Sequence, residues 1–148
     1  MKLTQFSDYS LRVLIALGAL PKEKKISIEE LSMAFHISKN HLMKVVHQLG
    51  KLELITTVRG RNGGIYLSKA PKDINIGWVI RHTEDHFHLV ECFNRENNQC
   101  FITPVCGYQA ILNEAVNQFL ATLDKYTLED VLGDRQVLQN MIVSSLYG

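Results

Sequence analysis

The pattern of apolar and polar residues predicts three helices in the first third of the chain. Residues 9–20 are apolar on nearly all sides, which is typical of a buried helix, and Ser7 or Asp8 is expected to cap its start. A serine and a glutamate with the spacing of a capping box open a shorter second helix that ends near Phe35. A third helix is expected over Ser38–Leu52, with its first residue as the cap.

The third helix and the segment after it predict a winged helix-turn-helix. Leucines and valines recur at i, i+3, i+4 and i+7 on one face of this helix, whereas amides, a histidine and lysines occupy the opposite face. Two β-branched runs, at 55–59 and 65–68, flank the glycine-rich segment 60–64, which favours a β-hairpin with a basic tip. The sequence therefore predicts a mainly α fold with a small β-hairpin wing.

The second half of the chain predicts a loop followed by a long helix. A helix is expected after Asn75, but residues 83–103 have no periodicity. Thr103-Pro104 is a strong helix start, from which we expect one helix to about Tyr126. Apolar side chains form a wide stripe along it: Tyr108, Ile111, Leu112, Ala115, Val116, Phe119, Leu120 and Leu123. Such a stripe beside a small domain favours a dimerisation helix, with packing inside the chain as the alternative.

These patterns divide the chain into three parts. Residues 1–70 are expected to form a winged helix-turn-helix DNA-binding domain, and residues 71–103 a connecting helix and a cysteine-bearing loop. Residues 104–148 would contain the long dimerisation helix and the C-terminal helices, the last of them over about 135–146.

The composition is ordinary for a soluble protein, with 46% hydrophobic and 21% charged residues. The amino terminus lacks the basic region, apolar stretch and cleavage site of a signal peptide. The longest apolar run, 13–20, is too short to cross a bilayer. We therefore expect a cytoplasmic protein with no membrane partner, in which free thiols stay reduced.

Positive charge is concentrated on the third helix and the wing. Between Ser38 and Lys69 six Lys or Arg residues accompany one acid, giving a local charge of +5 in a chain of net charge +1. Such cations bind phosphates, while amides and guanidinium groups read base edges, so we expect a double-stranded DNA partner. The candidate contacts are Ser38, Lys39, Asn40, His41, Lys44, Arg59, Arg61, Asn62, Gly63 and Gly64. The alternative, that the cations only solvate a surface, is weakest for the two arginines on the wing tip.

The only three cysteines of the chain, Cys92, Cys100 and Cys106, fall within fifteen consecutive positions. An odd, clustered set is a poor disulfide framework. It is a plausible ligand set for a metal or iron–sulfur centre that takes its fourth ligand elsewhere. The alternative is that small cysteines fill a core, but the residues between the thiols are mostly polar.

The chain resembles the winged-helix iron–sulfur transcription regulators, and among them the nitric-oxide-sensing repressors, over about residues 1–132. The segments that carry the resemblance are DYSLRVLIALGAL, SKNHLMKVVHQLG, VRGRNGGIYL, INIGWVIRHTE, ITPVCG and LDKYTLEDV. The RGxxGG wing and the three cysteines mark the family as a whole, while the last two segments are similar to its nitric-oxide-sensing branch.

This resemblance implies a homodimeric repressor of operator DNA with one cluster per subunit. In proteins of this type the three cysteines bind a [4Fe–4S] cluster, and an aspartate of the other subunit, which matches Asp8 here, is the fourth ligand. A carboxylate is a harder and weaker ligand for this iron than a thiolate, so nitric oxide could displace it and weaken DNA binding. A plain helix cap is the alternative role for Asp8.

One departure from the family pattern bears on the type of cluster. IscR-like members bind a [2Fe–2S] cluster and use a histidine three residues after the last cysteine, where this chain has Gln109. His86 and His88 could substitute, but we interpret them as solvated loop residues. The seven-residue gap between the first two cysteines is also longer than the five common in the family. A [4Fe–4S] cluster is therefore favoured, and a repressor that senses iron–sulfur supply or redox state through a [2Fe–2S] cluster or free thiols is the alternative.

No motif of a catalytic site is present. The sequence has no zinc-deaminase pattern, no HExxH, no nucleophile elbow and no phosphate-binding glycine loop before a helix. We therefore predict that the protein is not an enzyme.

Overall fold

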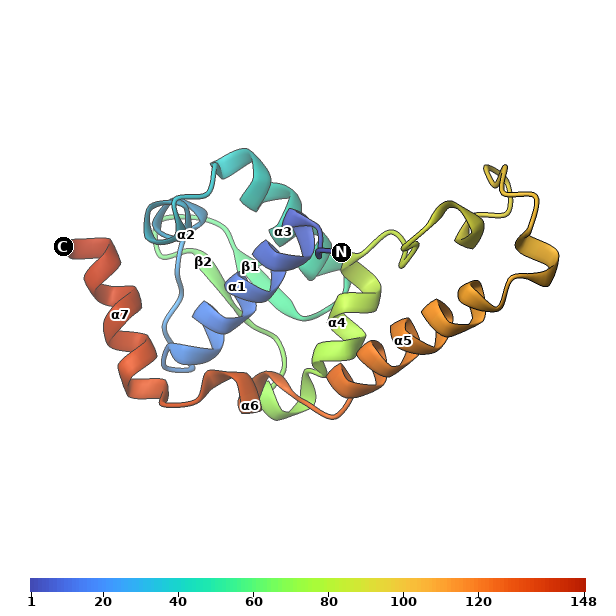
Figure 1. Cartoon of the computed structure of the whole chain (residues 1–148). Coiled ribbons are helices and arrows are strands. Elements are labelled where there is room, and N and C mark those ends of the chain that lie inside the picture. The colour runs from blue at the N-terminus through green and yellow to red at the C-terminus, as the bar shows by residue number, and fades with distance from the viewer.

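The computed structural model describes all 148 residues as a mainly helical molecule with one β-hairpin (Figure 1). In chain order the elements are α1 (Gln5–Ala19), α2 (Ile28–Phe35), α3 (Lys39–Lys51), β1 (Ile55–Val58), β2 (Gly64–Leu67), η1 (Pro71–Asp73), α4 (Ile76–Thr83), η2 (Glu91–Phe93), η3 (Thr103–Val105), α5 (Gly107–Leu123), α6 (Leu128–Leu132) and α7 (Arg135–Tyr147). None of the helices combines the length and the apolar character needed to span a membrane.

The molecule consists of a head, a projecting arm and two C-terminal helices (Figure 1). The head consists of residues 1–83, from the amino terminus through α4, and includes the hairpin. The arm consists of residues 84–123, which are the cysteine loop and α5, and Figure 1 shows it projecting from the head. The helices α6 and α7 follow the arm and return along α1. The single buried core lies in the head and beneath these two helices.

Helix α3, the predicted DNA-recognition helix, packs on the core as its pattern predicts. The buried side chains of α3 are Leu42, Val45, Val46 and Leu49. They face α1, whose residues Val13 and Leu14 are also fully buried. Each Å² of apolar surface removed from water stabilises the fold by about 25 cal/mol, so this contact is a main source of stability for the head. Because one face of α3 is fixed on the core, the opposite face is presented to solvent.

Side chains cap most of the helix starts, and three of the predicted caps are confirmed in the first four helices. Ser27 caps α2 in a capping box, Ser38 caps α3 and Asn75 caps α4. The prediction that Ser7 or Asp8 caps the first helix is wrong. The Thr4 hydroxyl accepts the Ser7 amide at 3.2 Å, so α1 begins at Gln5 and both predicted cap residues lie inside the helix.

The wing is a two-stranded antiparallel hairpin with one further pairing. Ile55 lies opposite Leu67, and Val58 lies opposite Gly64 next to the turn at the tip. Ile26 joins β2 through two backbone hydrogen bonds with Ile65, of 3.2 and 2.8 Å, which hold the wing against the segment before α2. The hairpin is therefore anchored to the head on one side and free at its tip.

The long helix of the arm begins at Gly107, three residues later than the predicted start at Pro104 with Thr103 as the cap. The Thr103 hydroxyl donates to the Cys100 carbonyl at 2.8 Å, and residues 103–105 form a single 3₁₀ turn. The α-helix starts at Gly107 with Cys106 as its N-cap residue, and it ends at Leu123 rather than near Tyr126. The last cysteine thus stands at the helix entrance instead of inside its first turn.

The outer end of the apolar stripe on α5 has no cover within the chain, whereas Val116, Phe119 and Leu123 pack against the core. Leu120, near the base of the arm, is the one buried residue of this helix. Tyr108 and Ile111, near the outer end, are 60% and 64% exposed. Packing inside the chain therefore accounts only for the inner end of the stripe.

The C-terminal helices close the base of the head. The Thr127 amide and hydroxyl donate to the Asp130 carboxylate at 2.7 and 2.9 Å, which opens α6 and holds the pKa of that carboxyl below its usual value. The side chain of Leu132 reaches Gly18, where an added Cβ would lie 3.1 Å from it. The predicted final helix is confirmed, and Figure 1 shows it extending along the side opposite the arm.

Candidate DNA-binding surface and cysteine loop

The amino end of α3 presents the predicted recognition residues to solvent. The Ser38 hydroxyl accepts the His41 amide at 3.3 Å, so this serine is occupied as a helix cap. Asn40, His41 and Lys44 are exposed on the face opposite the core. The His41 ring also lies 6.0 Å, centroid to centroid, from the ring of Tyr9 on α1. Helix α1 is therefore in contact with the end of α3 that would read a DNA groove.

Lys39, one of the predicted DNA contacts, has an ion-pair partner that the sequence pattern does not indicate. Its ammonium Nζ lies 2.6 Å from Glu29 Oε1 on α2. Both side chains are more than half exposed, so the pair contributes little to stability. The carboxylate nevertheless partly neutralises Lys39. Glu29 is visible in the sequence as an acid in the first turn of the second helix, but its distance to Lys39 on the third helix is not.

The wing tip brings two arginines and an amide to the surface. Arg59, Arg61 and Asn62 are all exposed, and none of them forms a salt bridge. Glycine is required behind them, since a Cβ on Gly63 would lie 2.2 Å from the Val58 carbonyl oxygen and Gly64 has a φ of +145°. The tip can therefore bring cationic side chains and bare backbone close to another molecule.

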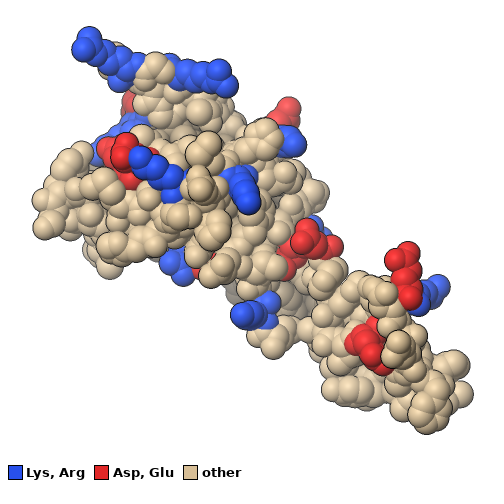
Figure 2. Space-filling view, turned by 90° about the horizontal axis from the view of Figure 1, so that it is seen from above, with Lys and Arg blue, Asp and Glu red and all other residues tan.

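The charge is divided between the head and the arm. Figure 2 shows Lys and Arg side chains along the edge of the head, and Asp and Glu side chains gathered on the projecting arm. The sequence has the same division, because Glu84, Asp85, Glu91 and Glu96 all belong to the cysteine loop. A polyanion such as DNA would be attracted to the head and repelled by the arm.

All three cysteines lie on the arm and are free and half-buried. Side chains of two other residues form hydrogen bonds with the backbone of Cys92 and Cys100. Gln109 Nε2 on α5 donates to the Cys92 carbonyl at 2.7 Å, and Asn98 Oδ1 accepts the Cys100 amide at 3.1 Å. Cys106 ends the loop at the entrance of α5. Gln109, which occupies the position of the IscR-like histidine, therefore ties the loop to the helix.

Within one chain the thiols are near one another in sequence but do not form a closed ligand set. No three His, Cys, Asp or Glu side chains lie close enough together to hold a metal ion. His86 and His88 are exposed and stack on each other, with ring centroids 4.4 Å apart. The structure thus shows the thiols on one loop, but it does not show them converging.

Asp8, the predicted fourth ligand, lies on the head and not beside the cysteines of its own chain. It occupies the first turn of α1, with 46% of its side chain exposed. Its Oδ2 accepts from Arg12 Nη2 one turn later at 2.8 Å, and that guanidinium also lies over the Tyr9 ring. Because Thr4 is the cap of α1, the alternative role of Asp8 as a cap is excluded.

A groove of about 750 Å³ runs beside the arm. Its walls are the amino-terminal residues, the first part of the cysteine loop and the apolar stripe of α5. Ten of its fifteen lining residues are hydrophobic, among them Leu112, Val116 and Phe119. The uncovered stripe therefore continues into a concave apolar surface at the base of the arm.

The comparison with known sequences decides the family. Residues 3–134 match the Rrf2 family, which is described as an iron-dependent transcriptional regulator. The chain belongs to the Rrf2 family. The family resemblance inferred from the wing and the cysteine segments is therefore confirmed.

Two Rrf2 relatives have the name HTH-type transcriptional regulator NsrR and are similar over nearly their whole length. The protein of Bacillus licheniformis is 51% identical over 142 residues, covering 96% of this chain and 99% of its own. That of Bacillus subtilis is 50% identical over 142 residues, covering 96% and 97%. The resemblance to this branch of the family is thus confirmed, and these relatives are named as regulators and not as enzymes.

Solved structures confirm the fold class. A putative transcriptional regulator from Listeria innocua matches with a TM-score of 0.73 at 25% identity, covering 90% of this chain and 88% of that one. IscR from T. potens and the oxidised form of CymR from Staphylococcus aureus each give a TM-score of 0.72 at 22% identity. They cover 90% of this chain and 88% and 97% of their own. The mainly helical fold with a hairpin wing is therefore an Rrf2 fold.

Proposed function

We propose that this Rrf2 regulator is a cytoplasmic, nitric-oxide-responsive repressor that binds operator DNA as a homodimer. The observation that carries the proposal is the placement of the three free cysteines on an arm, apart from a head with an exposed recognition helix and a basic wing. The proposed sensing loop and the proposed DNA-reading surface would then be separate parts of one chain. The similarity to proteins named NsrR supports the same function.

The DNA-binding part of the proposal assigns different tasks to the recognition helix and the wing. Asn40 and Lys44, exposed on α3, would enter the major groove, and the Ser38 cap fixes the start of that helix. Arg59 and Arg61 would bind the backbone or enter a minor groove from the wing tip. Since Lys39 is paired with Glu29, we expect it to contribute less than Lys44.

The chemistry of the side chains on the arm fits an iron–sulfur cluster. Three reduced thiols on one loop are the donors that such clusters use, and Cys92, Cys100 and Cys106 would hold it. When bound, a cluster supplies iron atoms that can take a small ligand such as nitric oxide in place of a weakly held carboxylate. The loop would have to draw the thiols together, since they do not converge in the single chain.

A [4Fe–4S] cluster remains favoured over a [2Fe–2S] cluster. Gln109 supplies no imidazole nitrogen, and its side-chain amide is committed to the Cys92 carbonyl. The three thiols therefore need one ligand from elsewhere, and Asp8 of the partner subunit is the proposed one. Its carboxylate is half exposed, and Arg12 is its one salt-bridge partner in the chain.

The uncovered arm supports the homodimer. The outer part of the α5 stripe and the groove beside it are apolar and exposed, which is unusual for a surface that stays in water. Pairing of this helix with its copy would cover both and would bring each head near the arm of the other chain. Two heads would then read two half-sites about 34–36 Å apart.

Helix α1 connects Asp8 with the proposed DNA-binding surface. The residue after Asp8 is Tyr9, whose ring lies beside the ring of His41 at the reading end of α3. A carboxylate held by the partner's arm would fix α1 and, through this contact, the recognition helix. Release of the carboxylate would free α1, so the spacing of the two recognition helices would no longer be held and DNA binding would weaken.

Serine variants of the cysteines test the cluster assignment. We expect anaerobically purified wild-type protein to be coloured and to contain iron and sulfide, and we expect C92S, C100S and C106S each to lose most of both. Q99S, which changes an exposed residue next to Cys100, is the matched control and should keep them. The measurement is iron and sulfide per chain together with the absorption spectrum.

The outcomes separate the alternatives. A spectrum of the [2Fe–2S] type would support the sensor of iron–sulfur supply. Colourless wild-type protein whose DNA binding changes with disulfide formation alone would support a thiol switch and contradict a cluster.

A further inference from the structure

The base of the arm is joined to the head by paired backbone segments that are far apart in sequence. The Ile76 amide donates to the Tyr126 carbonyl at 2.9 Å, and the Leu128 amide donates to the Ile74 carbonyl at 2.8 Å. These bonds connect the start of α4 with the turn that follows α5. The outer arm lacks such support, because only Leu120 of α5 is buried. The direction in which the arm points is therefore decided at its base.

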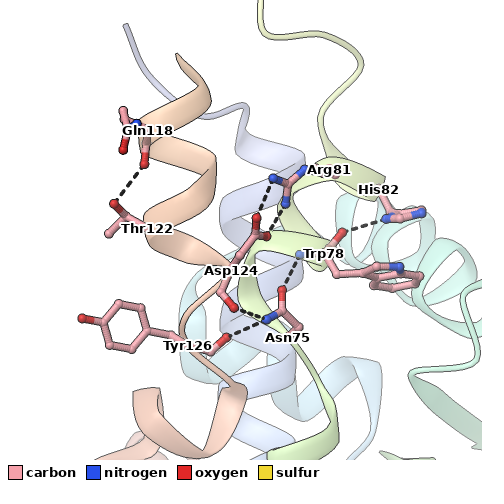
Figure 3. A network of polar contacts seen from close by, with 8 residues as sticks. All are labelled: Asn75, Trp78, Arg81, His82, Gln118, Thr122, Asp124 and Tyr126. Atoms are coloured by element: carbon pink, nitrogen blue, oxygen red, sulfur yellow. Dashed lines mark hydrogen bonds and ion pairs between the residues drawn. The ribbon is translucent and has the colours of Figure 1, made fainter. Parts of the chain in front are cut away.

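A double ion pair strengthens this junction. The two terminal nitrogens of the Arg81 guanidinium, Nη1 and Nη2, donate to the Asp124 carboxylate at the end of α5, with Nη2 at 2.8 Å from Oδ2 (Figure 3). The hydrogen bonds of this pair raise the pKa of Arg81 and lower the pKa of Asp124. A two-point contact between planar groups restrains orientation as well as distance. It can therefore resist rotation of α5 relative to α4.

The cap of α4 is part of the same network. Asn75 Nδ2 donates to the Asp124 carbonyl at 2.7 Å, while its Oδ1 accepts the Trp78 amide at 2.8 Å (Figure 3). Gly77 leaves space for the carboxylate, since a Cβ there would lie 2.0 Å from Asp124 Oδ1. One side chain thus caps α4 and holds the end of α5, and a glycine makes room for both contacts.

The other end of the arm is fixed to the helix that carries Asp8. Glu84 is the first residue of the cysteine loop, and its Oε1 accepts from the Thr4 amide at 2.8 Å and the Thr4 hydroxyl at 2.9 Å. Thr4 is the N-cap residue of α1. The arm is therefore attached to the head at both of its ends by polar side chains, through α4 at one end and α1 at the other.

We propose that the Arg81–Asp124 pair is a latch that fixes the arm on the head and relays the state of the cysteine loop to the recognition helix. The relay rests on the proposed function, because it requires a cysteine loop whose state changes. The latch itself rests on the contacts at the base of the arm. Arg81 and Asp124 are positioning residues, since neither lies on the cysteine loop or on the DNA-binding surface.

The test uses the full-length chain with one altered ion pair and a matched control. D124N removes the charge while keeping the size that the Gly77 contact allows, and R81K keeps the charge but loses the two-point contact. E129Q is the control, because Glu129 pairs with Arg135 between α6 and α7, away from the arm, at 3.9 Å. In cluster-free protein, hydrogen exchange at the Ile76 and Leu128 amides should be about threefold or more faster in D124N than in E129Q.

The second readout is the ratio of operator affinities between cluster-loaded and cluster-free protein. We expect D124N to lower this ratio by about threefold or more, R81K to lower it less, and E129Q to leave it at the wild-type value. Iron content should be the same in all of them. The emission of Trp78, the only tryptophan of the chain, reports whether the surroundings of α4 have changed.

The outcomes distinguish this inference from the function on which it rests. Unchanged exchange in D124N would overturn the latch, whatever the cysteine loop binds. Faster exchange with an unchanged affinity ratio would overturn the relay. A wild-type chain with equal affinity in both states would contradict the proposed function and the relay together, while the exchange data would still decide the latch.

Discussion

Loss of both wing arginines, in R59A/R61A, is expected to weaken operator binding by about tenfold or more at moderate salt. Both side chains are exposed and without salt-bridge partners, so their removal costs the head almost no packing. Each contact with a phosphate contributes about 0.9 to the slope of log affinity against log salt concentration. We therefore expect that slope to become shallower by about one to two, measured by fluorescence anisotropy of labelled operator DNA over a range of salt concentrations.

The control for charge is K72A/R95A, which removes two exposed cations from the base of the head and from the arm. It should change neither the affinity nor the salt slope by more than about a factor of two. An equal loss in the control would mean that net charge, and not the wing, governs binding.

A second pair of variants tests the shape of the wing. G63A forces a Cβ against the Val58 carbonyl and should weaken binding, whereas G50A meets open space in α3 and should not.

D8A should abolish the response to nitric oxide while leaving the fold intact. The Asp8 side chain is half exposed and its salt bridge to Arg12 is on the surface, so its loss should change the free energy of unfolding by no more than about 1 kcal/mol. Cluster-free D8A should bind operator DNA like the cluster-free wild type. The proposed oxygen ligand is absent, however, so the affinity of cluster-loaded D8A should no longer change on addition of nitric oxide.

R12A is the matched control for this variant. It breaks the same ion pair but keeps the carboxylate, so it should retain the response to nitric oxide. Both variants are compared by operator affinity and by the absorption spectrum, before and after the addition. If D8A kept the full response in both measurements, release of a carboxylate ligand would not be the switching step.

The parts of the fold that the sequence predicted correctly depend on local signals. Ser27 with Glu30, Ser38 and Asn75 each satisfy an amide within three residues of themselves, so their spacing alone identified three helix starts. The glycines of the wing likewise act within the turn that contains them.

The two wrong helix starts have physical reasons in neighbouring segments. Thr4, Ser7 and Asp8 are all local candidates for the cap of α1, and the contact that distinguishes Thr4 is with Glu84, eighty residues later, which no local pattern indicates. Thr103 carries a strong local signal for a helix start, but its hydroxyl donates to Cys100 and a 3₁₀ turn forms instead. In both places a contact outside the predicted helix decided where the helix begins.

The same distinction between local signals and contacts of distant segments applies to the candidate sites. Clustering in the sequence located the exposed basic face of the third helix, the basic wing and the cysteine loop, because helix periodicity and loop composition are local properties. The Lys39–Glu29 pair and the Arg81–Asp124 pair join different helices, so neither follows from spacing. The convergence of the thiols and the position of Asp8 relative to them depend on a bound group and on a second chain, and those remain predictions.

The most direct test of the account is operator binding by anaerobically purified wild-type protein, titrated with nitric oxide while its absorption is recorded. We expect coloured protein that binds the operator as a dimer. We also expect an affinity that falls by about tenfold or more in step with the change in absorption. Colourless protein, or operator affinity that stays constant while the absorption changes, would contradict the proposal that the cysteine arm controls the DNA-binding head.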